Sequence, residues 1–278
     1  MKLLLLLCSA MMLSADQFAE YWYAGKAEVA VYDLQQSRYG LQRAGTATLI
    51  FVTEPFSAKK HVKLDSPALA GDDHLTALKL NRVKKYNTGI YPYSIMTSAF
   101  ANVSNGELLK VNTTIQEWCG HVFLQANQTK PAHYNYRGYS YFESEGDDEG
   151  TLSNTELAES LLLKIRLGKL GTPSSLVPPQ ELSRTLHFPL QKCQASYSTS
   201  TDDQNTTLTI TYNHPLKIST SITYSSSFPH VIQGWSESYS KNGHTFTTTA
   251  TLKSVQRLPY WSMNSPEFNS MRKAIGLE

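Results

Sequence analysis

The spacing of turn-forming residues constrains this fold more than any other feature of the sequence. Strand-sized runs rich in Thr, Val, Ile and Tyr alternate with short clusters of Gly, Asn, Asp and Pro. This pattern is typical of an antiparallel meander and not of βαβ units. We therefore predict a mainly β protein with one large curved antiparallel sheet or an open β-barrel. The predicted strands cover residues 26–34, 46–52, 60–64, 75–85, 90–103, 108–125, 183–188, 193–199, 206–212, 216–224, 230–239 and 245–255.

One segment departs from this pattern and predicts a single packed helix over about 153–167. Ser153 and Glu156 have the spacing of a capping box, and Gly168 is placed to end the helix. The Pro/Gly/Ser-rich residues 168–180 form a possible sub-boundary within one domain. The apolar stripe of the helix consists of Leu157, Leu161 and Ile165.

The first fifteen residues predict a secretory signal peptide. Lys2 precedes the apolar run 3–13, and small residues at Ser14 and Ala15 offer a cleavage site. The mature chain, 16–278, is then exported and periplasmic, as a single β-rich domain without a transmembrane span. Acylation at Cys8 would instead make the protein a membrane-anchored lipoprotein.

The charge pattern argues against nucleic acid as a partner. The formal net charge is +2, and Lys and Arg are scattered along the chain. The densest basic run, at 82–85, lies in a predicted strand, and we interpret it as a solvated face. A nucleic-acid-binding protein carries a concentrated basic surface, which this sequence does not predict.

The stretch from Gln116 to Gly150 holds the candidate reactive groups. Cys119 and His121 share one face if they lie on a strand, and Glu143 and Glu145 form a candidate acid pair. Cys119 and Cys193 either form a disulfide in an oxidising compartment or remain separate thiols. We predict no catalytic residue, no metal site and no cofactor from these patterns, because the common catalytic motifs are not present in the sequence.

Aromatic residues are the main candidates for ligand binding, since the chain has 16 Tyr, 4 Trp and 10 Phe. Rings that are exposed on a curved sheet form platforms for lipid chains, peptides or sugars. We predict such a platform on the concave face of the sheet. Its residues are Tyr91, Tyr93, Trp118, Tyr139 and Tyr141.

Several motifs resemble a known group of proteins from about residue 21 to residue 167. They are YWYAGKAE (21–28), RYG (38–40), LIFVTEPF (49–56), VKLD (62–65), GIYPYSIMTS (89–98), EWCGH (117–121) and SYFESEGD (140–147). The chain resembles exported bacterial envelope proteins that are labelled "septum formation inhibitor Maf". Cytosolic Maf pyrophosphatases carry a Ser-x-Ser-Pro-Arg-Arg motif on an α/β fold. This sequence has no such motif, so the resemblance implies an exported envelope protein and no activity.

These observations together predict an exported, non-catalytic envelope protein. It would bind or carry an apolar or glycan ligand, or a protein partner, on an aromatic-lined face of the sheet. The alternative is a hydrolase that uses the acidic cluster near 143–149. A hydrolase would need Glu143 or Glu145 at the bottom of a cleft.

Overall fold

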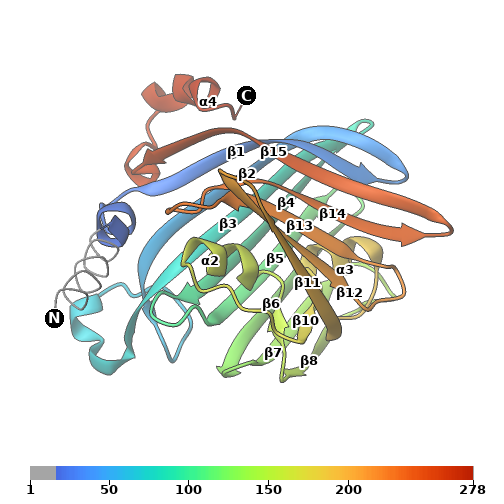
Figure 1. Cartoon of the computed structure of the whole chain (residues 1–278), viewed down its shortest axis with the longest axis horizontal. Helices are drawn as coiled ribbons and strands as arrows, with labels where there is room; N and C mark the ends of the chain where they lie inside the picture. The colour runs from blue at the N-terminus through green and yellow to red at the C-terminus, as the bar shows by residue number, and fades with distance from the viewer. Residues whose placement is uncertain (1–16, 278) are drawn as a thin grey trace.

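The computed structural model describes residues 17–277, and most of this part of the chain belongs to one sheet (Figure 1). The predicted signal peptide and Cys8 lie outside the described residues. The fifteen strands of residues 17–277 are β1 (Ala27–Arg38), β2 (Leu41–Ser57), β3 (His74–Thr88), β4 (Tyr91–Asn102), β5 (Leu108–Glu117), β6 (Gly120–Lys130), β7 (His133–Ser140), β8 (Asp148–Ser153), β9 (Glu156–Leu157), β10 (Ser175–Val177), β11 (Cys193–Thr201), β12 (Asn205–Tyr212), β13 (Ser219–Ser225), β14 (Ile232–Lys241) and β15 (His244–Leu258).

Helices are few and short in this part of the chain. Residues 17–22 form a helical segment that precedes β1. The α-helices are α2 (Ser160–Arg166), α3 (Gln180–Leu186) and α4 (Met271–Ala274), and the 3-10 helices are η1 (Pro67–Leu69), η2 (Gly71–Asp73), η3 (Tyr260–Ser262) and η4 (Pro266–Ser270).

The sheet is a curled meander whose two edges are adjacent in the sequence. Its strand order is β8-β7-β6-β5-β4-β3-β2-β1-β15-β14-β13-β12-β11-β10-β9, and only β9 and β10 pair in parallel. The edge strand β8 ends at Ser153 and the opposite edge strand β9 begins at Glu156. Three chain steps reach at most about 11 Å, so the two edges meet at this corner although they do not pair. The predicted large, open antiparallel sheet is confirmed.

Three predicted strands differ from the observed ones. The run 108–125 is two strands, because residues 117–120 form a turn between β5 and β6. The run 60–64 contributes only an isolated bridge between Phe56 and Lys63. The run 183–188 is predicted as a strand, but residues 183–186 belong to helix α3 and His187 ends that helix; buried charged side chains of α3 pair with charges on other elements.

The predicted helix has the correct end and the wrong beginning. Gly168 follows α2 with a φ of +64°, and its amide donates to the Ile165 carbonyl, as expected for a glycine C-cap. The helix begins at Ser160 and not at 153, because Glu156 and Leu157 pair with β10 as strand β9. The predicted capping box is therefore not used.

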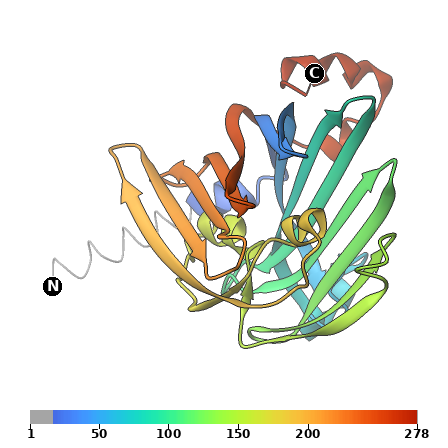
Figure 2. The same cartoon turned by 90° about the vertical axis from the view of Figure 1, so that its right-hand side faces the viewer.

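The segment from β9 to α3 fills the concave side of the sheet. Figure 2 shows α2 and α3 between the two arms of the curled sheet. Every residue of α2 is buried, and Leu157, Leu161 and Ile165 belong to the main hydrophobic core. Helix α2 is thus a buried helix and not an amphipathic surface helix.

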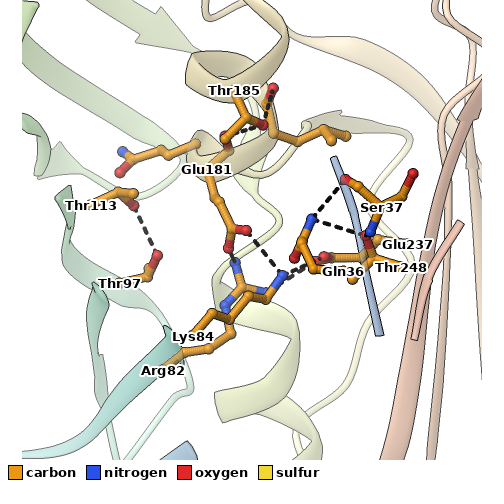
Figure 3. Close-up of polar contacts among 12 residues, drawn as sticks. Gln36, Ser37, Arg82, Lys84, Thr97, Thr113, Glu181, Thr185, Glu237 and Thr248 are labelled. Carbon is orange, nitrogen blue, oxygen red and sulfur yellow. Dashed lines mark hydrogen bonds and ion pairs between the residues drawn. The ribbon is translucent and has the colours of Figure 1, made fainter. Parts of the chain in front are cut away.

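A buried network of four charges joins this interior segment to both arms of the sheet (Figure 3). Lys84 Nζ on β3 lies 3.0 Å from Glu181 on α3 and 2.8 Å from Glu237 on β14. Arg82 Nη2 and Nη1 lie 3.1 Å from the same two carboxylates. The interpretation of 82–85 as a solvated face is therefore wrong for Arg82 and Lys84. Two carboxylates neutralise the two cations, and this pairing offsets the desolvation cost of burying the charges.

A second buried ion pair fixes the end of α2. Arg166 donates to both carboxylate oxygens of Glu28 on β1, and neither side chain is exposed. The guanidinium carbon lies 5.1 Å from the ring centre of Trp22 and 4.9 Å from that of Phe51. The ion pair and the ring contacts together hold α2 against the first two strands.

The first prediction concerns the charge network. Glu237→Gln leaves Arg82 and Lys84 with one carboxylate between them, so we expect the free energy of unfolding to fall by roughly 3–5 kcal/mol. Urea unfolding followed by circular dichroism measures this loss. The matched control is Glu149→Gln, because Glu149 pairs with Arg137 on the surface, where the two side chains are 74% and 72% exposed. An equal effect of the two substitutions would contradict a structural role for the network.

Glu159, the residue before α2, is a buried acid without a close cation. Its Oε1 accepts a hydrogen bond of 2.6 Å from the backbone amide of Gln180 and so joins α2 to α3. Burial raises the pKa of Glu159 to about 7, although Arg82 acts in the opposite direction. Burial also acts to raise the pKa of Glu237, but Lys84 and Arg82 outweigh it and hold that pKa at about 2.

The second prediction follows from these opposite shifts. The raised pKa of Glu159 means that its contribution is favourable below its ordinary value of 4.5 and is lost as the pH rises through about 7. Between pH 5 and pH 8, wild type should lose on the order of 3 kcal/mol more stability than Glu159→Gln. Glu237 titrates below pH 4.5 and does not interfere. Parallel pH curves for the two proteins, measured by urea unfolding, would refute this assignment.

Candidate functional site

Exposed aromatic and aliphatic side chains gather at one end of the sheet. In a meander, alternate turns lie at the same end, which places the β1–β2, β3–β4, β5–β6, β7–β8 and β14–β15 turns together. The blue β1–β2 hairpin and the red β14–β15 hairpin both end at the right of Figure 1. We call Tyr39, Tyr91, Tyr93, Trp118 and Tyr141 the aromatic rim, because they lie at or beside four of these turns.

Direct contacts connect the rim residues across three hairpins. The ring centres of Tyr91 and Trp118 are 6.2 Å apart with nearly parallel planes, and those of Tyr91 and Tyr93 are 5.9 Å apart. Tyr141 packs over Gly120, where an added Cβ would lie only 2.8 Å from its ring. Glycine at 120 therefore allows the last ring of the rim to lie over the β5–β6 turn.

The rim is anchored to the interior by Arg38 and Tyr93. Tyr93 is buried, and its hydroxyl lies 2.9 Å from that of Tyr39 and 3.1 Å from Arg38 Nη2. Arg38 Nη1 also donates to the Thr185 carbonyl of α3 at 2.6 Å. Burial, and then the hydrogen bond with Tyr39, raises the pKa of Tyr93, so its phenol stays neutral. These contacts position the exposed rings on a rigid base.

Two aliphatic residues extend the rim toward solvent. Ile90 in the β3–β4 turn is 87% exposed, and Leu41 at the start of β2 is 59% exposed. Trp118 and Tyr141 are 69% and 71% exposed. Single exposed apolar residues are ordinary, but a row of them on neighbouring turns indicates an interaction surface.

The charges beside this row are of one sign on three of the hairpins. The segments 37–43, 85–92 and 240–245 carry Arg38, Arg43, Lys85 and Lys241 and contain no Asp or Glu. On the next turn, the Glu117 carboxylate accepts a hydrogen bond from the Cys119 amide at 2.6 Å. The surface therefore combines apolar tips and basic residues on these three hairpins with an acidic run, including exposed Glu143 and Asp147, on the β7–β8 turn.

Tyr139 does not belong to the rim, although the sequence predicted all five aromatic residues on one concave face. It lies on the opposite, convex face of β7, where it is 49% exposed and pairs across the sheet with Phe123 on β6. Tyr134 and Gly138 lie on the other face of β7 from Tyr139, and both are buried. Trp118 and Tyr141 lie in turns and not on strands.

The candidate nucleophile and its partner are not brought together as a catalytic pair. Cys119 is exposed in the β5–β6 turn, and His121 is exposed at the start of β6 on the convex side. The hydrogen bond with Glu117 raises the pKa of the Cys119 thiol, which disfavours the reactive thiolate. Cys193 is buried at the start of β11, and both cysteines are free.

The two candidate acids are separated by their surroundings. Glu143 is exposed in the β7–β8 turn. The Glu145 side chain is 4% exposed, accepts from Ser140 at 2.6 Å and lies 2.8 Å from His187 and 3.8 Å from Arg184. Within residues 17–277, no group of three or more His, Cys, Asp or Glu is arranged to hold a metal ion.

None of the helices within residues 17–277 is long and apolar enough to cross a bilayer.

No protein-family model matches the chain, and no curated protein matches it either. Among solved structures, the chain is similar to a β-barrel-like protein of a domain of unknown function, DUF1849, from Brucella abortus. The two are 12% identical, the match covers 84% of this chain and 98% of that chain, and the TM-score is 0.46.

Proposed function

We propose that this chain is an exported, non-catalytic protein of the cell envelope that binds the surface of a phospholipid bilayer through its aromatic rim. The N-terminal signal sequence and the resemblance to exported envelope proteins support the location. The observation that carries the binding function is the row of exposed Ile90, Leu41, Trp118 and Tyr39 on adjacent hairpin turns.

The chemistry of this row matches that of a membrane interface. Trp and Tyr favour the headgroup level of a bilayer, while aliphatic side chains favour the acyl region beneath it. Arg43, Lys85 and Lys241 flank the row and would face the phosphates of anionic lipids. Each basic residue close to an anionic surface contributes roughly 1 kcal/mol to binding.

The interior of the sheet is a poorer candidate for a lipid. The interior segment fills the concave side, and the cavity beside Glu159 and Trp235 has a volume of about 30 Å³. A drug-sized ligand needs roughly 300 Å³ or more. Binding at the rim is therefore better supported than carriage of an apolar ligand inside the sheet.

The glycan and hydrolase alternatives have weaker support. Sugar rings stack on exposed aromatic rings, but Ile90 and Leu41 have no role in such a site. For the hydrolase, Glu145 is committed to His187 and Arg184, and Glu143 is exposed. A protein partner at the rim would use the same apolar residues as a bilayer. The vesicle-binding experiment below distinguishes these two kinds of partner.

The third prediction tests bilayer binding with vesicles of phosphatidylethanolamine and phosphatidylglycerol. Ile90→Asp removes an apolar contact of roughly 2 kcal/mol and adds a negative charge, so the partition coefficient should fall at least about tenfold. Co-sedimentation of the purified protein with the vesicles measures this coefficient. Replacing phosphatidylglycerol with phosphatidylcholine should also weaken the binding of wild type.

The matched control is Leu69→Asp. Leu69 is 86% exposed, almost as much as Ile90, but lies in the β2–β3 connection at the other end of the sheet. This variant should bind like wild type. Equal binding of the Ile90 variant and wild type would refute the proposal. Binding to isolated peptidoglycan without binding to vesicles would favour the glycan alternative.

A further inference from the structure

A small cavity lies deep between the interior segment and the β12–β14 wall. Apolar side chains such as Leu80 and Leu162 form much of its surface. Its polar lining comes from Glu159 of the interior segment and from Tyr212, Thr220 and Trp235 on β12, β13 and β14. The cavity thus lies at the contact between the interior segment and strands β12, β13 and β14.

Four buried polar atoms around this cavity lack hydrogen-bond partners of normal geometry, whereas the lining residues Arg82, Thr97 and Glu237 are hydrogen-bonded. Glu159 Oε2, Tyr212 OH, Thr220 Oγ1 and Trp235 Nε1 are all buried and form no hydrogen bond of normal geometry within residues 17–277, although Thr220 lies close enough to Tyr212 to act on its pKa. A buried polar atom without a partner costs roughly 1–3 kcal/mol, so native proteins rarely keep several together. This concentration of unpartnered atoms on one cavity indicates a hydrogen-bonding guest.

The volume of the cavity limits what the guest can be. A water molecule requires roughly 10–15 Å³ of cavity volume and 2–4 polar partners. The volume is about 30 Å³, which suffices for about two water molecules. Organic ligands with the size of a lipid or a sugar are too large.

We propose that the cavity is an internal hydration site, in which about two ordered water molecules bridge Glu159 Oε2 to Trp235 Nε1 and to the hydroxyls of Tyr212 and Thr220. The water bridge connects the interior segment to β12, β13 and β14. Strand β14 also carries Glu237 of the charge network. The hydration site goes beyond the proposed membrane binding and does not depend on it.

The donors and acceptors around the site are compatible with such a bridge. The indole N–H only donates, the two hydroxyls donate or accept, and the carboxyl oxygen does either according to its ionisation. Burial raises the pKa of Glu159 to about 7, so both of its forms are populated near neutral pH. Arg82 and Glu237, which also face the cavity, bond to each other at 3.1 Å.

The direct test is a high-resolution crystal structure of the wild-type protein, with and without xenon pressure. We expect about two water peaks within hydrogen-bond distance of Glu159 Oε2 and Trp235 Nε1, and no xenon. Xenon enters dry apolar cavities, so xenon density there, or no water peaks, would overturn the proposal. Since wild type is used, the result does not depend on a variant that folds.

A double-mutant cycle tests the bridge in solution as the fourth prediction. The unfolding constant of the double variant Glu159→Gln, Trp235→Phe should differ at least about fivefold from the value obtained by multiplying the effects of the two single substitutions. The reason is that the two side chains share the same waters. The matched control pairs Glu159→Gln with Trp22→Phe. Trp22 Nε1 is also buried without a partner but does not line this cavity. Multiplicative effects in both cycles would overturn the bridge.

Discussion

The charge network of Arg82, Lys84, Glu181 and Glu237 connects two strands that a flat sheet would keep far apart. In the sheet order, β3 and β14 are four strands apart, with β2, β1 and β15 between them. A flat sheet would separate them by roughly 19 Å at about 4.8 Å per strand. The side chains of the two strands nevertheless meet at 2.8–3.1 Å. The two arms therefore face each other across α3, whose Glu181 completes the network.

This arrangement explains why the concave side does not serve as a large binding cavity. The interior segment is held by the charge network, by Arg166 on Glu28 and by Arg184 beside Glu145. Each contact is buried, and removing one partner leaves an uncompensated charge in the interior. A filled interior leaves the outer surface of the molecule, including the hairpin turns, exposed to solvent. Arg38 joins the two regions, because it bonds both Tyr93 of the rim and Thr185 of α3.

The sequence predicted the sheet because turn chemistry and alternation are local signals. The predicted strand runs 206–212 and 245–255, which correspond to β12 and β15, and the glycine end of α2 at Gly168 are correct for the same reason. The beginning of α2 and the whole of α3 depend on pairing and burial against distant strands. Residues Glu156 and Leu157 have helical patterning but pair with residues twenty positions later in the sequence, Leu176 and Val177 of β10.

The candidate site was predicted in part. Tyr91, Tyr93 and Trp118 do meet, but Tyr39 and Ile90 were missed because the contacts between hairpin turns depend on the register of the sheet. Arg82 and Lys84 offered an overlooked signal, since they continue the face of Leu78 and Leu80 on β3. Charged residues on the buried face of a strand imply partners across the core. The identity of those partners, Glu181 and Glu237, required the fold.

The most direct test of the account is the depth of Trp118 in a bilayer. Two variants, Trp261→Phe and Trp118→Phe, are compared in vesicles that contain brominated phospholipids. Trp22 and Trp235 are buried, and Trp261 follows β15 at the end opposite the rim. Bromine should quench the fluorescence of the variant that keeps Trp118 and leave the variant that keeps Trp261 unchanged. Equal quenching of both, or none with Trp118, would contradict docking through the aromatic rim.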